Sequence, residues 1–234
     1  MTVNATIVCI SDTHLQHRNI QMPPGDILVH AGDWTMFGKN IADALDFIHW
    51  LDELPHAHKI VIAGNHELLM LNSAHRREVL DRFSRDNIIY LEDRGISIGG
   101  INFWGTPWQP SYGNLAFNLN DELERAEKWD LIPEGTHVLI VHGPPHGLRD
   151  CIPDDSARHA GCSALTDKIS KLPSLSAVIC GHIHEGAGVE TSDTGVLVVN
   201  SSICGQGRQA ENKPTVIKVT SGHQGKLLAK VGHP

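Results

Sequence analysis

Five short polar motifs of the chain are built from residues that bind metal ions. Each contains Asp, Asn or His, and each directly follows a run of four or five mostly apolar residues. Such runs are typical of buried strands, so the polar side chains would stand at strand ends. Core packing does not account for this arrangement. The motifs are Asp12-Thr13-His14, Gly32-Asp33, Gly64-Asn65-His66-Glu67, His142-Gly143 and Gly181-His182-Ile183-His184.

The candidate ligands are carboxylate, imidazole and amide groups. These groups suit Mn²⁺, iron or Zn²⁺, whereas a structural zinc site would favour thiolates. Seven ligands exceed the needs of one ion and match two ions that share a carboxylate. Two metal ions about 3.5–4 Å apart can activate water and neutralise a phosphoryl oxygen during an in-line displacement. The residues predicted to bind the metals are Asp12, His14, Asp33, Asn65, His142, His182 and His184.

The elements that must position these ligands alternate between strand and helix in the first half of the chain. Residues 40–51 place apolar side chains on one helix face, with Asn40 as N-cap and Leu54-Pro55 as the end. A second helix is predicted over 73–83. This alternation indicates parallel strands, whose carboxyl ends share one edge of a sheet.

The second half of the chain mixes short strands with two further helices. Gly99-Gly100 predicts a two-residue hairpin, and helices are predicted over 122–129 and over 163–172 with Ser163 as cap. No repeat or linker divides the sequence, so residues 1–234 are expected to form one α/β domain. The other strands are predicted at 88–91, 96–98, 101–104, 138–141, 177–180, 196–199, 215–219 and 227–231.

The composition narrows the range of partners. The chain has 234 residues and a formal net charge of −8, with its Lys and Arg residues scattered. Long nucleic acid is therefore an unfavourable partner, while a small phosphate ester can be neutralised by bound metals. No apolar run is long enough to span a membrane and no basic leader precedes the first strand, so we expect a cytoplasmic protein without a membrane partner.

The five cysteines include no CxxC pair, which favours reduced, structural thiols. Cys162 is the one whose loop setting leaves a different role open.

A loop over about 105–120 combines Pro, Gly and Asn with aromatic residues. Loops of this length are often functional, so the segment is a candidate pocket wall. Trp108 and Tyr112 could stack on a nucleobase, and anchoring the loop to the core is the equal alternative.

Several other polar residues have alternative readings. His146 and His159, in a loop over 146–162, are candidates for substrate contact, whereas His30 is expected to be a buried, hydrogen-bonded histidine. The histidines of the helices and their ends are expected to be solvated; they are His49, His56, His58 and His75.

Three polar residues are candidates for supporting the site without binding metal. Glu67 is expected to fix Asn65 or to cap the following helix. Glu185 could orient a ligand histidine, and Asn200 could brace the site from a strand end.

Taken in order, the five motifs resemble those of the calcineurin-like metallophosphoesterases, from about residue 6 to residue 204. Finer features resemble the metallophosphoesterase-domain-containing subgroup, the class III cyclic-nucleotide-phosphodiesterase-like branch. These features are Pro24-Gly25-Asp26, residues 60–68, Trp104-Gly105-Thr106-Pro107-Trp108-Gln109, Lys128-Trp129-Asp130-Leu131-Ile132-Pro133, His142-Gly143-Pro144-Pro145 and residues 181–186.

The resemblance implies a four-layer αββα sandwich of two mixed sheets, with the site in loops at one end of the sheets. It also implies how the ligands divide between the metals. One ion would be held by Asp12, His14, Asp33 and His184, and a second by Asp33, Asn65, His142 and His182. Mn²⁺ and iron are the expected ions, with Zn²⁺ as the alternative.

The resemblance further implies hydrolysis of a small phosphodiester by a metal-bridging hydroxide, with a 2′,3′- or 3′,5′-cyclic nucleotide as substrate. Asn65, His66, Trp108 and His146 are the candidate substrate contacts, and His66 would assist the leaving group. The alternatives are a phosphomonoesterase or phosphoprotein phosphatase, a nuclease, and a nucleotide-binding regulator without catalysis. A homodimer is compatible with the sequence.

Overall fold

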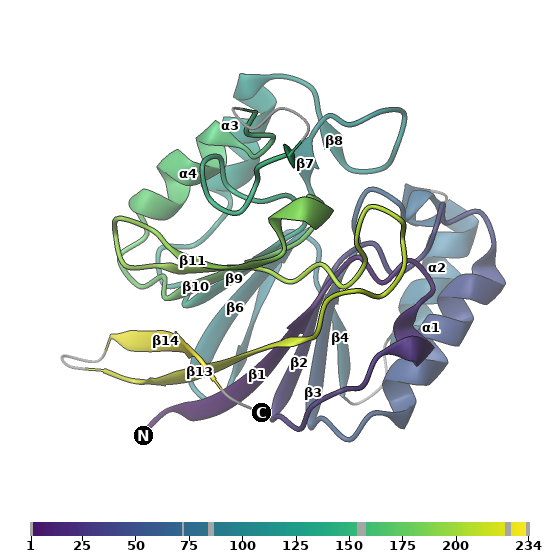
Figure 1. Cartoon of the computed structure of the whole chain (residues 1–234), viewed down its shortest axis with the longest axis horizontal. Coiled ribbons are helices and arrows are strands. Elements are labelled where there is room, and N and C mark those ends of the chain that lie inside the picture. The colour runs from purple at the N-terminus through teal and green to yellow at the C-terminus, as the bar shows by residue number, and fades with distance from the viewer. Residues whose placement is uncertain (1, 72, 84–86, 154–157, 223–225, 233–234) are drawn as a thin grey trace.

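Two six-stranded sheets lie face to face between two pairs of helices in the computed structural model (Figure 1). The structure describes residues 2–71, 73–83, 87–153, 158–222 and 226–232. This arrangement confirms the predicted αββα sandwich of two mixed sheets.

The first sheet has the strand order β14-β13-β1-β2-β3-β4. Strands β1 to β4 run parallel to one another. Strand β13 pairs antiparallel with β1, and β14 pairs antiparallel with β13 at the edge of the sheet. Its strands are β1 (Asn4–Ile10), β2 (Ile27–Ala31), β3 (His58–Ile62), β4 (Ile88–Tyr90), β13 (Thr215–Ser221) and β14 (Leu227–Val231).

The second sheet has the strand order β11-β12-β10-β9-β6-β5. Its four central strands are parallel, and β11 and β5 pair antiparallel at the two edges. Its strands are β5 (Arg94–Ile98), β6 (Ile101–Thr106), β9 (Val138–Val141), β10 (Ala177–Cys180), β11 (Gly188–Thr191) and β12 (Leu197–Asn200). Strand β11 was not predicted from the sequence.

The helices cover the outer faces of the sheets in pairs (Figure 1). Helices α1 (Ile41–Glu53) and α2 (Ser73–Phe83) lie on the first sheet, and α3 (Glu122–Asp130) and α4 (Ser163–Ser170) lie on the second. Short elements occupy the connections; they are η1 (His17–Asn19), η2 (Leu68–Leu71), β7 (Gln109–Pro110), β8 (Asn118–Leu119) and η4 (His184–Gly186).

Alternating side chains of the central strands build the three layers of core. In β1, Ile7 and Cys9 point between the two sheets, while Val8 and Ile10 pack toward α1 and α2. Strands of the second sheet alternate in the same way, with one set facing α3 and α4. The central strands are buried on both faces, which explains their nearly continuous apolar sequences.

Local signals account for most element boundaries. The Asn40 side chain accepts a hydrogen bond from the Ala42 N–H at 3.0 Å and so caps α1 as predicted. Gly99 and Gly100 have φ angles of 58° and 85° and form the β5–β6 hairpin. Ser163 was predicted to cap α4, but it is the first residue of the helix. The N-cap is Cys162, whose side chain makes no capping hydrogen bond.

Two histidine predictions have opposite outcomes. His30 is buried, and its Nε2 lies 3.0 Å from the Thr13 hydroxyl, as expected. His56 was expected to be solvated and is instead buried, with Nε2 3.1 Å from the Pro23 carbonyl oxygen.

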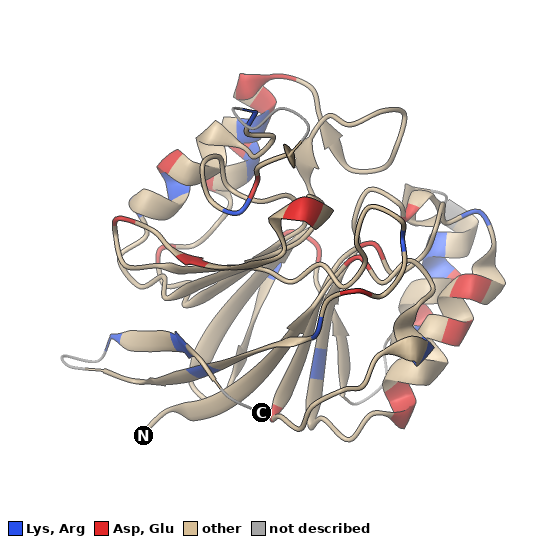
Figure 2. Cartoon of the chain, viewed as in Figure 1, with Lys and Arg blue, Asp and Glu red and all other residues tan. Residues whose placement is uncertain are grey.

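Charge is distributed over the helical faces. In Figure 2, acidic and basic segments alternate on the helices. The described residues form no continuous basic stripe on the side shown. Among the described residues, no helix is both long and apolar enough to cross a membrane.

Candidate metal centre

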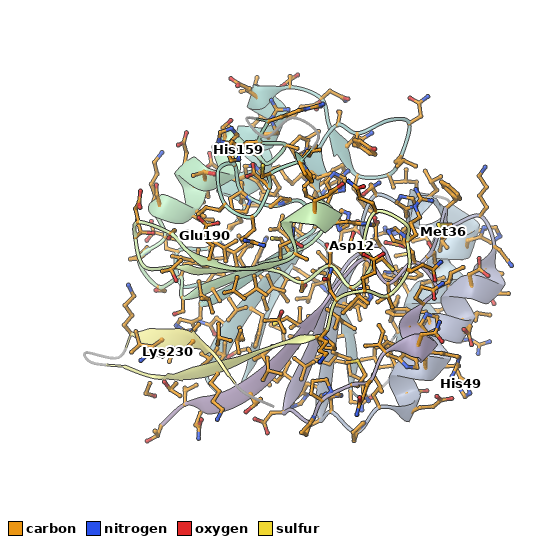
Figure 3. All side chains as sticks on the ribbon, in the orientation of Figure 1. Asp12, Met36, His49, His159, Glu190 and Lys230 are labelled. Atoms are coloured by element: carbon orange, nitrogen blue, oxygen red, sulfur yellow. The ribbon has the colours of Figure 1, made fainter. Side chains whose placement is uncertain are left out.

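The five polar motifs converge where the carboxyl ends of the parallel strands of both sheets meet. In Figure 3, Asp12 lies at this junction, whereas His49 and Glu190 lie on the periphery. The chain turns sharply after three of the strands, with φ angles of 50° at Asp12, 57° at Asp33 and 67° at His182. Such left-handed backbone is uncommon for residues other than glycine and clusters at functional sites.

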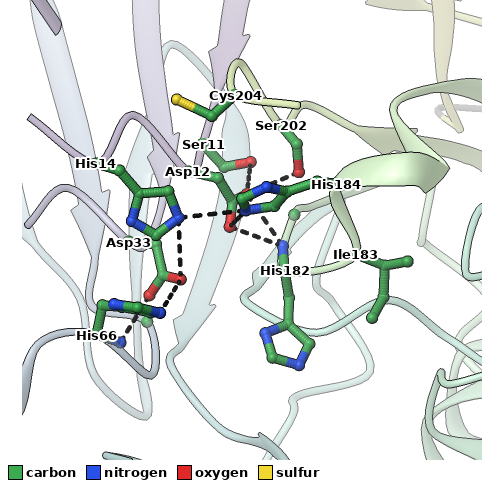
Figure 4. Close-up of polar contacts among 12 residues, drawn as sticks. Ser11, Asp12, His14, Asp33, His66, His182, Ile183, His184, Ser202 and Cys204 are labelled. Atoms are coloured by element: carbon green, nitrogen blue, oxygen red, sulfur yellow. Dashed lines mark hydrogen bonds and ion pairs between the residues drawn. The ribbon is translucent and has the colours of Figure 1, made fainter. Parts of the chain in front are cut away.

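Asp12, His14 and His184 form the first group of ligand atoms, all within 4.8 Å of one another (Figure 4). The Nε2 atom of His184 lies 3.5 Å from Asp12 Oδ1 and 3.2 Å from His14 Nε2. The Nδ1 atom of His14 lies 3.1 Å from the Thr35 carbonyl oxygen. The Nδ1 atom of His184 lies 3.0 Å from the Gly205 carbonyl oxygen. Each Nδ1 therefore carries a hydrogen, which directs the Nε2 lone pair into the site.

Asn65, His142 and His182 form the second group. Asn65 Oδ1 lies 2.8 Å from both His142 Nε2 and His182 Nδ1. The Nδ1 atom of His142 is held by the Ala31 carbonyl oxygen at 2.9 Å, so its Nε2 is the atom presented to the site.

Asp33 lies between the two groups. Its Oδ2 is 3.8 Å from His14 Nε2 in the first group, and its Oδ1 is 3.4 Å from His142 Nε2 in the second. One carboxylate thus presents a different oxygen to each group, which is the placement expected of a bridging ligand.

The donor atoms fit metal ions. Metal–ligand distances of about 2.0–2.2 Å place neighbouring ligands roughly 3 Å apart, as the atoms around Asn65 are. The facing Nε2 atoms of His14 and His184 would repel as two lone pairs unless a proton or a metal ion lies between them. The oxygen and imidazole donors suit Mn²⁺, iron or Zn²⁺.

Without metal ions, the carboxylates and histidines of the site shift one another's pKa. Burial by itself would raise the pKa of Asp12, but His184 holds it well below the usual range, and His142 does the same for the pKa of Asp33. Against burial, Asp33 raises the pKa of His142 to about 9, and Asp12 raises that of His184 to about 9. Burial together with His142 lowers the pKa of His182 to about 4.

Two serines that the sequence analysis missed support Asp12. Its Oδ2 accepts hydrogen bonds from the hydroxyls of Ser11 at 2.6 Å and Ser202 at 2.8 Å. The His182 N–H also donates to this carboxylate, at 3.0 Å (Figure 4). The charged form of Asp12 is therefore fixed by donors from three segments.

Glu67 has a different role from the one predicted. Its buried carboxylate accepts hydrogen bonds from the backbone N–H groups of Asp33, Thr35 and Gly64 and from the Thr35 hydroxyl, at 2.7–2.9 Å. It thus joins the loops after β2 and β3 and does not fix the Asn65 side chain. Burial, with the charge of Asp33, raises the pKa of Glu67 to about 8.

His66 stands beside the ligand groups with one ring nitrogen held. Its Nδ1 hydrogen-bonds to the Met36 carbonyl oxygen, and its Nε2 lies 4.0 Å from Asp33 Oδ2. Its backbone N–H donates to Asp33 Oδ1 at 2.8 Å. The Phe37 ring covers the imidazole at a centroid distance of 5.2 Å.

A cavity of about 270 Å³ opens onto the two groups. Tyr112 lines it from the 105–120 loop, and its ring meets His182 edge-on at 5.6 Å. This segment therefore contributes one pocket-lining residue. The described residues that line the cavity are His14, Asp33, Asn65, His66, Tyr112, Ile152, His182, Ile183, His184, Glu185, Gln206 and Arg208.

Trp108 and His146 do not line this cavity. The Trp108 indole N–H donates to Asp93 at 3.0 Å, and the Lys128 ammonium lies 4.4 Å from its ring centroid. The aromatic ring is thus held in the loop by its own partners and is not brought to the pocket.

His146 instead packs against His159, with ring centroids 5.3 Å apart. His159 pairs with buried Asp150 at 2.6 Å and lies apart from Asp12 (Figure 3). These contacts stabilise the described parts of the 146–162 loop, which leave out residues 154–157, and give no support to a substrate contact. Cys162 in the same loop accepts a hydrogen bond from the Trp129 indole at 3.3 Å, which indicates a structural role.

The predictions for the other two supporting residues, Asn200 and Glu185, have opposite outcomes. Asn200 braces the site as predicted, because its amide donates to the Ile183 carbonyl oxygen at 2.8 Å and holds the turn between His182 and His184. Glu185 was expected to orient a ligand histidine and instead accepts a hydrogen bond from Gln206 at 2.7 Å.

Comparison with known proteins agrees with this geometry. The calcineurin-like phosphoesterase family matches residues 5–186. The chain is 38% identical to human metallophosphoesterase domain-containing protein 1 over 233 residues, which cover 90% of this chain and 69% of the human protein. It is 27% identical over 203 residues to a probable glycerophosphodiester phosphodiesterase of Arcobacter nitrofigilis, covering 76% of this chain and 71% of that protein.

A solved structure superposes with a TM-score of 0.66 over 98% of this chain and 99% of its own, at 18% identity, which supports the fold alone. An αββα sandwich with two groups of metal ligands at its strand ends defines the metallophosphoesterase class. The chain belongs to the calcineurin-like phosphoesterase family. Membership implies a metal-dependent phosphoester hydrolase.

Proposed function

We propose that the protein is a two-metal phosphodiesterase that hydrolyses small phosphodiesters, with cyclic nucleotides as the leading candidates. The observation that carries this proposal is the position of Asp33, whose two carboxylate oxygens face two separate groups of ligands. A single carboxylate in this position suits a pair of metal ions that act together on one phosphoryl group.

Each ion would have its own set of ligands, and Asp33 would belong to both sets. The first ion would be bound by Asp12, His14, Asp33 and His184, and the second by Asp33, Asn65, His142 and His182. When bound, the metals supply an activated water molecule and neutralise phosphoryl charge. Mn²⁺ and iron are our preferred ions, with Zn²⁺ as the alternative.

His66 would act on the ester oxygen that leaves. The Met36 carbonyl holds its Nδ1, and Asp33 holds its backbone N–H, so the ring is fixed with Nε2 on the side of the cavity. A hydrogen at Nε2 can pass to the departing oxygen, and this nitrogen lies 4.0 Å from Asp33 Oδ2, beside both groups of ligands.

The preference for a small phosphodiester has three supports. The cavity volume of about 270 Å³ lies near the lower end of the range typical of small-molecule sites. The net charge of −8 disfavours long nucleic acid. The Arcobacter relative is named as a probable phosphodiesterase.

Substrate assays on the metal-loaded protein test the proposal. The protein is stripped with a chelator, reloaded with Mn²⁺ and assayed with p-nitrophenyl phosphate, its bis ester and a panel of 2′,3′- and 3′,5′-cyclic nucleotides. We expect hydrolysis of the diesters to exceed that of the monoester. A clear preference for the monoester would replace this proposal with a phosphomonoesterase, and tight nucleotide binding without hydrolysis would indicate a regulator.

The cytoplasmic location and the homodimer stay predictions. Cell fractionation and sedimentation of the purified protein are the measurements that test them.

A further inference from the structure

Arg208 lies at the rim of the metal centre in a turn tied to one of the ligands. Its backbone N–H donates to the Gly205 carbonyl oxygen at 2.9 Å, and the same carbonyl holds His184 Nδ1 at 3.0 Å. Arg208 has a φ of 54°, which is uncommon for a residue with a side chain. The turn therefore fixes the position of Arg208 relative to the first ligand group.

The Arg208 guanidinium has unused hydrogen-bonding capacity. One nitrogen lies 3.0 Å from the Met36 sulfur, a weak acceptor, and its central carbon lies 5.4 Å from the Phe37 ring centroid. No carboxylate within the described parts of the chain forms an ion pair with it, Asp12 and Asp33 included. A guanidinium has five N–H donors, so most of them need acceptors from water or a ligand.

Arg208 is also the only Lys or Arg among the described residues that line the cavity. It reaches the cavity on the side of His66, because Met36 and Phe37 contact both residues. Tyr112 marks a different side, beside His182. The cavity thus has a cationic side next to the candidate proton donor and an aromatic side next to the second ligand group.

We propose that Arg208 is a specificity residue that binds an anionic substituent on the leaving group of the substrate. This inference rests on the proposed function, in which His66 faces the departing oxygen. In the proposed function the metals neutralise the charge of the scissile phosphate, so that phosphate does not need Arg208. Arg208 also pairs with neither Asp12 nor Asp33. A second oxyanion, either a carboxylate or a phosphate, is the group that a planar guanidinium binds best.

Three matched phosphodiesters test this inference. All are methyl aryl phosphates with a nitrophenol leaving group, which carries a carboxylate, the methyl ester of that carboxylate, or a phosphonate at the same ring position. We expect the Mn²⁺-loaded protein to hydrolyse the carboxylate or phosphonate probe with a kcat/KM about ten- to a hundred-fold above that of the neutral ester. The better anionic probe distinguishes a carboxylate from a phosphate-type group.

Two variants assign this preference to Arg208. In Arg208→Gln the ratio of anionic to neutral kcat/KM should fall close to one, and Arg208→Lys should retain part of it because the charge remains. Lys213→Gln is the matched control, because it removes an exposed positive charge five residues away and outside the cavity. Its ratio should equal that of the wild type.

The outcomes separate this inference from the proposed function. Hydrolysis of all three probes at equal rates, or a ratio unchanged in Arg208→Gln, would overturn the role of Arg208 and leave the phosphodiesterase in place. If the wild type hydrolyses none of the three probes, both the role of Arg208 and the proposed phosphodiesterase activity are overturned.

Discussion

The backbone N–H of Asp33 donates to the carboxylate of Glu67 at 2.9 Å. A buried acid beyond β3 therefore holds the loop that carries the bridging candidate beyond β2. The same carboxylate accepts the Gly64 N–H at 2.7 Å, so one side chain couples the ends of two neighbouring strands.

We expect Glu67→Gln to weaken the site and the fold together. A glutamine offers one acceptor oxygen and turns an NH₂ group toward backbone donors, which leaves buried N–H groups unsatisfied at a cost of about 1–3 kcal/mol. Urea unfolding of the chelated protein and metal content after reloading measure the two effects. Glu185→Gln is the control, because its partner Gln206 is exposed. Equal stability and metal content in both variants would contradict the role of Glu67.

Asn65 and His66 are adjacent in sequence but should respond differently to alanine. Asn65 Oδ1 lies among the second group of ligand atoms, so Asn65→Ala should lower metal occupancy. His66→Ala should retain both metals and reduce kcat by about 10²–10⁴-fold, because general acid catalysis is lost. Metal analysis and kinetics on the same preparations distinguish the two. Loss of metal in His66→Ala would place this residue among the ligands.

Metal binding should release protons. His142 and His184 have a pKa of about 9 in the metal-free protein and are charged below that pH, whereas metal ligation requires neutral rings. Affinity should therefore rise with pH up to about 9. Calorimetry at pH 7 in buffers of different ionisation enthalpy should show release of at least two protons, reduced by about one in His184→Ala. Absence of proton release would contradict the charge state inferred here.

Acid should destabilise the chelated protein through His30. Burial lowers the pKa of His30 from 6.5 to about 3, so between these values the unfolded chain binds a proton that the folded chain does not. Stability from this group is complete above pH 6.5 and falls by about 1.4 kcal/mol for each unit below it. The replacement His30→Gln keeps a polar group for Thr13 and should flatten this part of the pH dependence. An identical pH profile for the two proteins would rule the effect out.

Sequence patterns predicted which candidate ligands come together because strand ends are local features. Apolar runs located β1, β2, β3, β9 and β10, and parallel topology brought their carboxyl ends together. Patterns could not locate the backbone carbonyls of Thr35 and Gly205 that orient the ligand histidines, since a carbonyl has no residue signature. Arg208 was missed for a related reason: its place at the cavity depends on a turn far along the chain.

Trp108 shows a choice between two equal alternatives, stacking on a substrate or anchoring the loop, that the sequence pattern could not decide. Its aromatic loop was a reasonable pocket wall, but the indole is held by Asp93 and Lys128, which lie 15 and 20 positions away in sequence. Only the tertiary arrangement of β5 and α3 determines which face of the loop these partners occupy. Tyr112, four residues later, is the aromatic residue that lines the cavity.

The bridging role of Asp33 is tested most directly by electron paramagnetic resonance of the Mn²⁺-loaded protein, combined with metal analysis. The wild type should bind two ions per chain with an exchange-coupled signal, and Asp33→Asn should lose both the coupling and the diesterase activity. Asp46→Asn, at the surface, serves as the control. A coupled pair of ions and wild-type activity in Asp33→Asn would contradict the two-metal site described here.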